Sequence, residues 1–146
     1  NFKDFEYPVG QIDENVCVGD ILEPEVSDRF TISDKLWKGH QARKHMHEKK
    51  GNGFGFCLFN KDSKYTSTIS ARYYKDGSEA LIEQSEKNPR MLTPRECARL
   101  QGFTDDFIIP VSNARAYKQF GNSVCIPVIE AVAKAMLDYL GEYKIL

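Results

Sequence analysis

The sequence predicts an α+β fold in which a small mixed region with short strands is followed by helices. Runs rich in β-branched and aromatic residues, above all YTSTISARYY, favour strands in the middle of the chain. Thr93 and Glu96 form a capping box that marks the start of a helix. Near the end of the chain, apolar residues recur at every fourth position and predict one apolar helix face: Val124, Val128, Val132, Met136 and Leu140.

Length and composition exclude several classes of protein. With 146 residues, of which 41% are hydrophobic, the chain has enough material for one ordinary domain or two small lobes. A net charge of −1 means that any affinity for nucleic acid has to come from local clusters of basic residues. No apolar run is long enough for a membrane span, and the first residues lack the pattern of a signal peptide, so we expect a cytoplasmic protein without a membrane partner.

The first 25 residues are expected to form an irregular connector, because they show no sustained hydrophobic period. Ser33 and Asp34 then offer N-caps for a helix that Gly51 ends. This helix is strongly basic and carries few acidic residues. Its cationic residues are Lys35, Lys38, Arg43, Lys44, Lys49 and Lys50.

Two strand-like runs follow the glycine-rich segment GNGFGF, namely FCLFN and YTSTISARYY. A turn at Lys75-Asp76-Gly77 leads to a third run, ALIEQ, and this order predicts a hairpin. The polar stretch SEKNPR separates this region from the helices, so we place the boundary of a lobe, residues 26–89, at this stretch.

Residues 90–146 are expected to be mainly helical. Pro94 occupies the first position of the helix that Thr93 caps, and Leu92 can pack on Cys97. Gly102 ends this helix, and Gly141 ends the last one.

The tripeptide Gly121-Asn122-Ser123 precedes the last helix. The N-terminus of a helix has unpaired N–H groups and a partial positive charge, so this turn is a candidate site for a carboxylate or a phosphate. The alternative is that Ser123 only caps the helix.

Two long segments resemble the ninth and tenth motifs of cytosine-5 DNA methyltransferases: RMLTPRECARLQGFTDDF and RAYKQFGNSVCIPVIEAVA. The resemblance covers Arg90 to about Ala133 and is weaker back to the first residue. It implies that residues 1–25 connect to a catalytic domain, that 26–89 form the target recognition lobe, and that 90–146 return to the catalytic domain. The C-terminal helices would then complete an α/β Rossmann-like methyltransferase domain that is absent from this chain.

The resemblance also implies roles for particular residues. In this family the Gly-Asn-Ser turn lines the pocket for S-adenosylmethionine, which implies cofactor contacts by Asn122, Ser123 and Val124. The ninth motif organises the recognition lobe, which implies structural polar contacts by Arg90, Arg95, Glu96 and Arg99.

Target recognition is expected between the connector and Arg90, on double-stranded DNA. The order of basic helix, GNGFGF and TSTISARYYKDGSE resembles recognition regions of enzymes that act on CCGG, CCWGG or CCNGG. Gln41, Asn52 and Arg72 have donor groups suited to base edges, whereas the basic helix, with Arg43 and Lys44, suits phosphates. Thr68-Ile69 matches a dipeptide that lies against the DNA in this family. The alternatives are that the helix is a solvated charged face and that the aromatic residues are core.

Catalysis needs a cysteine in a Pro-Cys loop in this family, and no cysteine here follows a proline. The resemblance therefore implies the C-terminal portion of a DNA (cytosine-5)-methyltransferase from a bacterial restriction-modification system. Its expected partner is the N-terminal catalytic part of the same enzyme or a partner subunit. The chain alone should be inactive. A natural subunit of a split enzyme and a non-catalytic DNA-binding module remain alternatives, and Asn1 at the start favours a fragment.

We expect no metal site, since histidines two positions apart on a helix point to different faces.

Overall fold

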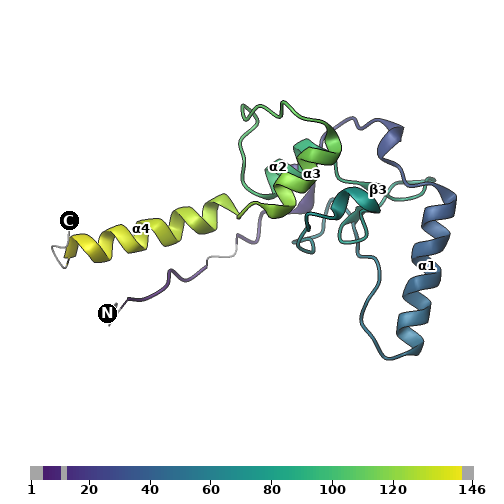
Figure 1. Ribbon diagram of the computed structural model, residues 1–146, viewed down its shortest axis with the longest axis horizontal. Coiled ribbons are helices and arrows are strands. Elements are labelled where there is room, and N and C mark those ends of the chain that lie inside the picture. The colour runs from purple at the N-terminus through teal and green to yellow at the C-terminus, as the bar shows by residue number, and fades with distance from the viewer. Residues whose placement is uncertain (1–4, 11–12, 143–146) are drawn as a thin grey trace.

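The computed structural model describes residues 5–10 and 13–142. Four α-helices carry most of the regular structure: α1 Asp34–Lys49, α2 Pro94–Leu100, α3 Asn113–Asn122 and α4 Ile126–Glu142 (Figure 1). Three two-residue strands make one small sheet: β1 Leu58–Phe59, β2 Leu81–Ile82 and β3 Arg90–Met91. Two short 3₁₀ turns precede α1, η1 Val18–Ile21 and η2 Asp28–Phe30, and a third, η3 Tyr73–Lys75, lies between β1 and β2.

The basic helix α1 has the limits that the sequence predicts. The side chain of Ser33 accepts a hydrogen bond from the Leu36 N–H at 3.3 Å, and Gly51 follows the helix with a φ of 71°. On the side facing the rest of the molecule, His40 is buried and lies 3.1 Å from the backbone oxygen of Asp76. That contact joins the middle of α1 to the segment after η3.

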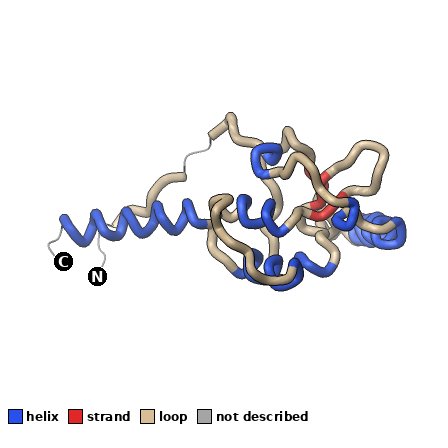
Figure 2. Tube along the Cα trace, turned by 90° about the horizontal axis from the view of Figure 1, so that it is seen from above, coloured by secondary structure: helices blue, strands red, loops and turns tan. Residues whose placement is uncertain are grey.

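The predicted hairpin between residues 65 and 84 is wrong. No strand forms between residues 65 and 74, and β2 pairs in parallel with β1 and antiparallel with β3. Figure 2 shows how little of the chain is strand. The physical reason is burial: Ile69 and Tyr73 are four positions apart and both enter the core, and the Tyr73 N–H bonds to the Ser70 oxygen at 3.0 Å. The segment therefore turns instead of extending.

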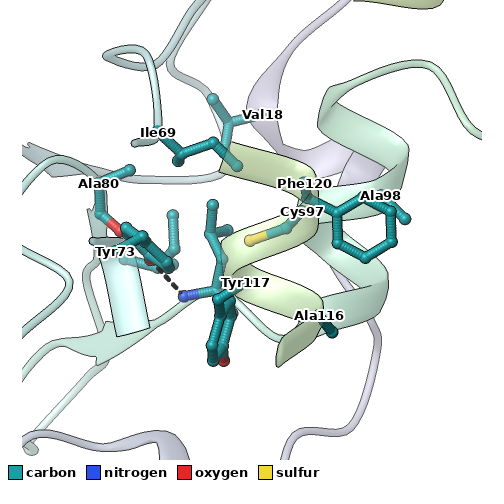
Figure 3. Close-up of a cluster of buried hydrophobic side chains, with 11 residues drawn as sticks. Val18, Ile69, Tyr73, Ala80, Cys97, Ala98, Ala116, Tyr117 and Phe120 are labelled. Atoms are coloured by element: carbon teal, nitrogen blue, oxygen red, sulfur yellow. Dashed lines mark hydrogen bonds between the residues drawn. The ribbon is translucent and has the colours of Figure 1, made fainter. Parts of the chain in front are cut away.

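The core contains side chains from the sequence before residue 90 and from the sequence after it (Figure 3). Tyr73 is its polar centre, because its hydroxyl donates to the Ala80 oxygen at 2.6 Å and accepts from the Leu92 N–H at 2.8 Å. The Tyr117 hydroxyl donates to the Leu92 oxygen at 2.6 Å. Burial raises the pKa of both tyrosines, so both stay neutral hydrogen-bonding groups. The boundary between residues 89 and 90 stays a prediction.

The capping box of α2 is confirmed: Thr93 accepts from the Glu96 N–H, and the Glu96 carboxylate accepts from the Thr93 N–H. The helix α3 was not predicted. Its buried residues, Ala116, Tyr117 and Phe120, are spaced by one, three and four positions on one face. This face packs on α2 and η3, so α3 joins the two halves of the core.

The last helix, α4, is confirmed and extends away from the body of the molecule (Figure 1). Much of its apolar stripe is exposed, with Val128 at 57% and Met136 at 41%. Residues 5–10 run beside it, and the rings of Phe5 and Tyr139 are 5.7 Å apart. Within the described ranges, no helix has the length and apolar character that crossing a membrane requires.

Candidate functional site

The turn between α3 and α4 differs from the turn that the sequence suggests. Gly121 and Asn122 are the last two residues of α3, Ser123 is its C-cap, and α4 begins only at Ile126. The N–H and the hydroxyl of Ser123 both bond back to the Phe120 oxygen, at 3.2 and 2.8 Å. The placement of Gly121 to Ser123 at a helix N-terminus is therefore wrong, because these residues form the C-terminal end of α3. Binding of an anion by these residues stays a prediction.

Gln101 makes hydrogen bonds to both ends of this turn. Its side-chain amide donates to the Phe120 oxygen at 3.2 Å, and its backbone oxygen accepts from the Ile126 N–H at 2.9 Å. The next residue, Gly102, has a φ of 84°, and a Cβ there would lie 2.5 Å from the Cδ of Pro127. The residues after α2 thus fix both the Phe120 carbonyl in the last turn of α3 and the first turn of α4.

Gly121 packs directly against the backbone of the segment before η3. A Cβ on this residue would lie 2.2 Å from the carbonyl carbon and oxygen of Ser70 and 2.5 Å from the Ala71 nitrogen. These atoms are backbone and cannot rotate away. Glycine is needed here for close packing against a peptide group, and not to end the helix.

Asn122 and Ser123 line an open depression of about 400 Å³, together with Arg115, Lys118 and Gln119. Residues 115, 118 and 122 share one face of α3, because they are three and four positions apart. Arg115 and Lys118 make no ion pair with any described residue. Two unpaired cations beside an amide and a hydroxyl suit a carboxylate or a phosphate. Val124, which follows, is 58% exposed.

The segment on the other side of the Gly121 contact holds the candidate DNA contacts Thr68, Ile69 and Arg72. Thr68 and Arg72 are exposed. Ile69 is only 2% exposed and belongs to the core, so its side chain is not available to a ligand. Of the dipeptide, only Thr68 presents a side chain to solvent.

The remaining candidates are on α1 and in the segment that follows it. Gln41 and Asn52 are exposed. The Lys44 ammonium lies 4.7 Å from the centre of the Phe56 ring, which orients this cation. Arg43 lies 3.5 Å from the Asp76 carboxylate, with half of its side chain exposed.

Asp76 links α1 to the segment that carries Arg72. Burial would raise the pKa of its carboxyl, but hydrogen bonds from Ser78 and the nearby His40 and Arg43 outweigh burial and hold the pKa below its ordinary value. The carboxylate is therefore charged at neutral pH. It partly neutralises Arg43, which leaves the other cations of α1 as the stronger candidates for phosphate contacts.

Arg90 and Glu96 form a buried, bidentate ion pair. The two guanidinium nitrogens lie 2.7 and 2.8 Å from the carboxylate oxygens, and the side chains are 8% and 0% exposed. The same carboxylate accepts from the N–H of Thr93 at 2.7 Å and from the N–H of Glu23 at 2.9 Å. Four donors satisfy one buried carboxylate, which ties the connector and β3 to α2.

The other two arginines of α2 hold the loop that follows this helix. Arg95 donates to the backbone oxygens of Thr104 and Phe107, at 3.3 and 2.8 Å. Arg99 makes two hydrogen bonds to Asp105, at 2.7 and 2.9 Å, and the bond from Arg99 lowers the pKa of that carboxyl. These contacts are structural in kind, because each joins α2 to backbone or side-chain atoms of the loop.

The sequence analysis missed Gln101, Arg115 and Lys118. The spacing of Arg115, Lys118 and Asn122 could have revealed one polar face, had α3 been predicted. In the part of the chain that the structure describes, no three or more His, Cys, Asp or Glu side chains are grouped so that they could hold a metal.

Comparison with known proteins finds one family. The model of the C-5 cytosine-specific DNA methylases matches residues 1–138. Type II methyltransferase M1.ScrFI of Lactococcus lactis subsp. cremoris is 60% identical over 144 residues, which are 99% of this chain and 37% of the relative. For M.NlaX of Neisseria lactamica the identity is 62% over 144 residues, covering 97% of this chain and 45% of the relative.

More distant proteins share the same fold. A DNA-cytosine methyltransferase of Escherichia coli K12 is 41% identical over 145 residues, covering 84% of this chain and 31% of that protein. The crystal structure of S. pombe Dnmt2 methyltransferase superimposes with a TM-score of 0.70 at 18% identity, covering 90% of this chain and 44% of that one. The chain therefore spans less than half the length of the proteins that it matches.

Proposed function

The chain belongs to the C-5 cytosine-specific DNA methylase family, and from this premise we propose that it is the C-terminal portion of a DNA (cytosine-5)-methyltransferase. The observation that carries the proposal is the family match along residues 1–138, together with relatives named Type II methyltransferases at about 60% identity. In this proposal, the enzyme methylates C5 of cytosine within a short specific site and serves a bacterial restriction-modification system.

The end of α3 would hold the cofactor. S-adenosylmethionine supplies the methyl group, and its methionine end carries a carboxylate. The residues present fit this group, because the depression beside Asn122 and Ser123 also has the unpaired cations Arg115 and Lys118. Asn122, Ser123 and Val124 would line the pocket, and Arg115 and Lys118 would balance the negative charge.

The recognition side would divide into two kinds of contact. Gln41, Asn52 and Arg72 would donate to base edges, and Thr68 would lie against the backbone of the duplex. Arg43 and Lys44 would hold phosphates. Sites of the CCGG, CCWGG or CCNGG kind remain the proposed targets.

The exposed stripe of α4 would cover the catalytic part of the enzyme. An apolar face with side chains 41–57% exposed is typical of a surface that another segment buries. No cysteine of this chain follows a proline, so the nucleophile would come from that other segment and the chain alone would not methylate DNA.

A chimera tests the proposal. The chain replaces the corresponding 144-residue segment of M1.ScrFI, and incorporation of tritiated methyl groups into plasmid DNA is measured. We expect methylation, and sequencing of the methylated cytosines then gives the target. DNA binding by the chimera without methyl transfer would instead support a binding module.

One pair of variants of this chimera tests the cofactor contact. Asn122→Ala should raise the KM for S-adenosylmethionine at least about tenfold, because a hydrogen bond to a charged group contributes roughly 1.5–3 kcal/mol. Asn113→Ala removes an exposed asparagine from the other end of the same helix and should leave this KM unchanged. Equal effects of the two substitutions would refute the placement of the cofactor.

A further inference from the structure

We propose that Ser70 is a positioning residue for the cofactor contacts, which it fixes through Gly121 although it belongs to the segment with the candidate DNA contacts. The inference rests on the proposed function, since it takes Asn122 and Ser123 to be cofactor contacts. Ser70 itself touches neither ligand in this proposal. It acts by holding the peptide group on which the end of α3 rests.

The first step is the contact between Gly121 and the peptide group of Ser70 and Ala71. A Cβ at Gly121 would lie 2.2–2.5 Å from three backbone atoms of that group, a distance that real Cβ atoms do not show. The last turn of α3 therefore lies directly on this peptide group. Any displacement of residues 70 and 71 toward α3 must move Gly121, and with it Asn122 and Ser123.

The second step is how the Ser70 peptide group is held. The Ser70 hydroxyl donates to the Glu79 carboxylate at 2.6 Å and accepts from the Arg72 N–H at 3.1 Å. The Ser70 backbone oxygen accepts from the Tyr73 N–H at 3.0 Å. Ile69 before it and Tyr73 after it are buried. The hydroxyl thus ties this peptide group to Glu79, between two residues whose side chains are in the core.

The third step is the arrangement on the two sides of this anchor. Thr68 and Arg72 flank Ser70 and are exposed, so a duplex bound there would press on the same turn. Asn122 and Ser123 lie one and two residues beyond Gly121. One turn therefore supports both sets of proposed contacts, and any change that one ligand makes in the affinity for the other is returned by the same factor.

The test uses the complete enzyme, that is, this chain together with its catalytic part. The Kd for S-adenosylhomocysteine is measured by calorimetry without DNA and with a cognate duplex. Ser70→Ala should raise the Kd without DNA about three- to tenfold, the effect of losing hydrogen bonds worth roughly 0.5–1.5 kcal/mol. Hydrogen exchange at the Ser123 amide should accelerate in the same variant. The KM for the cofactor should rise more than kcat falls.

Ser63→Ala is a matched control. The Ser63 hydroxyl also accepts from a backbone N–H, that of Asn60 at 3.0 Å, and also donates to a side-chain oxygen, that of Asn60 at 3.2 Å. It lies in a turn that does not contact Gly121. This substitution should leave the Kd for S-adenosylhomocysteine and the exchange of the Ser123 amide unchanged.

Glu79 provides a conservative rescue. Glu79→Ala removes the acceptor of the Ser70 hydroxyl and should weaken cofactor binding, whereas Glu79→Gln keeps an oxygen acceptor and should restore most of the affinity. The double variant Ser70→Ala/Glu79→Ala should be no weaker than the worse single variant, because both remove one interaction.

Two outcomes would overturn the inference: a Kd within twofold of the unsubstituted enzyme for Ser70→Ala, or equal effects of Ser70→Ala and Ser63→Ala. These results are distinct from failure of the proposed function. If the unsubstituted enzyme neither binds S-adenosylhomocysteine nor methylates DNA, the proposed function fails. That result comes from the unsubstituted enzyme alone, whereas the inference is tested only by comparing the variants with it.

Discussion

Substitution of Glu96 by alanine should cause a large loss of stability. The substitution removes a carboxylate that is 0% exposed and leaves Arg90, 8% exposed, as a buried charge without its partner. It also removes the acceptor of the Thr93 and Glu23 N–H groups. Breaking a buried ion pair from one side costs about 3–5 kcal/mol. With a urea dependence of about 2 kcal/mol per M, the midpoint should fall by about 1.5–2.5 M.

Urea unfolding of the purified chain, followed by far-ultraviolet circular dichroism, measures this loss. The double variant Arg90→Met/Glu96→Leu should recover part of it, because no unpaired charge remains, although two N–H groups stay without an acceptor. Asp105→Ala removes the exposed partner of Arg99 and serves as the control, with little effect expected. A loss below about 1 kcal/mol for Glu96→Ala would refute the reasoning.

Three other substitutions or treatments probe the core. Tyr73→Phe removes a hydroxyl that bonds to Ala80 and leaves the Leu92 N–H unpaired, so urea unfolding should show a loss of about 1–3 kcal/mol; a neutral result would contradict the bonding in Figure 3. Gly121→Ala should cost about 3 kcal/mol in the same assay, because α3 must leave the Ser70 peptide group, and an unchanged midpoint would rule that contact out. Burial raises the pKa of the Cys97 thiol far above its ordinary value of 9.0, so the native protein binds more protons than the unfolded chain at alkaline pH. The resulting stabilisation is complete below pH 9 and is lost as the pH rises further; iodoacetamide at pH 8 should alkylate Cys97 last, as peptide mass spectrometry would show.

Local patterns predicted three of the four α-helices, because each has signals of its own. Ser33 caps α1, Thr93 and Glu96 form the box of α2, and the four-residue period of α4 needs no partner to be recognised. The polar contacts of Arg90 and Glu96 came from the resemblance to the family, since nothing in the spacing of the two residues shows that both are buried.

The failures concern residues whose role depends on distant segments. The run of Thr, Ile and Tyr between residues 65 and 74 has strand propensity, but Ile69 and Tyr73 are buried at helical spacing, so tertiary packing overrode propensity. Gly121 suggested a break before the last helix, yet it is inside α3 because that helix packs on the Ser70 peptide group. The contact between Gly121 and Ser70 joins residues about 50 positions apart in the sequence, so no local pattern around either residue predicts it.

The irregular segment before residue 26 is an integral part of the folded body. Val18 is 4% exposed in the core, its N–H bonds to the Ser63 oxygen at 2.7 Å, and the Glu23 N–H is one of the four donors to Glu96. An exchange of this region between relatives would therefore have to carry the residues from 13 onward. A graft that began at residue 26 would remove Val18 from the core cluster that includes Ile69. It would also leave the buried Glu96 carboxylate without the hydrogen bond from the Glu23 N–H.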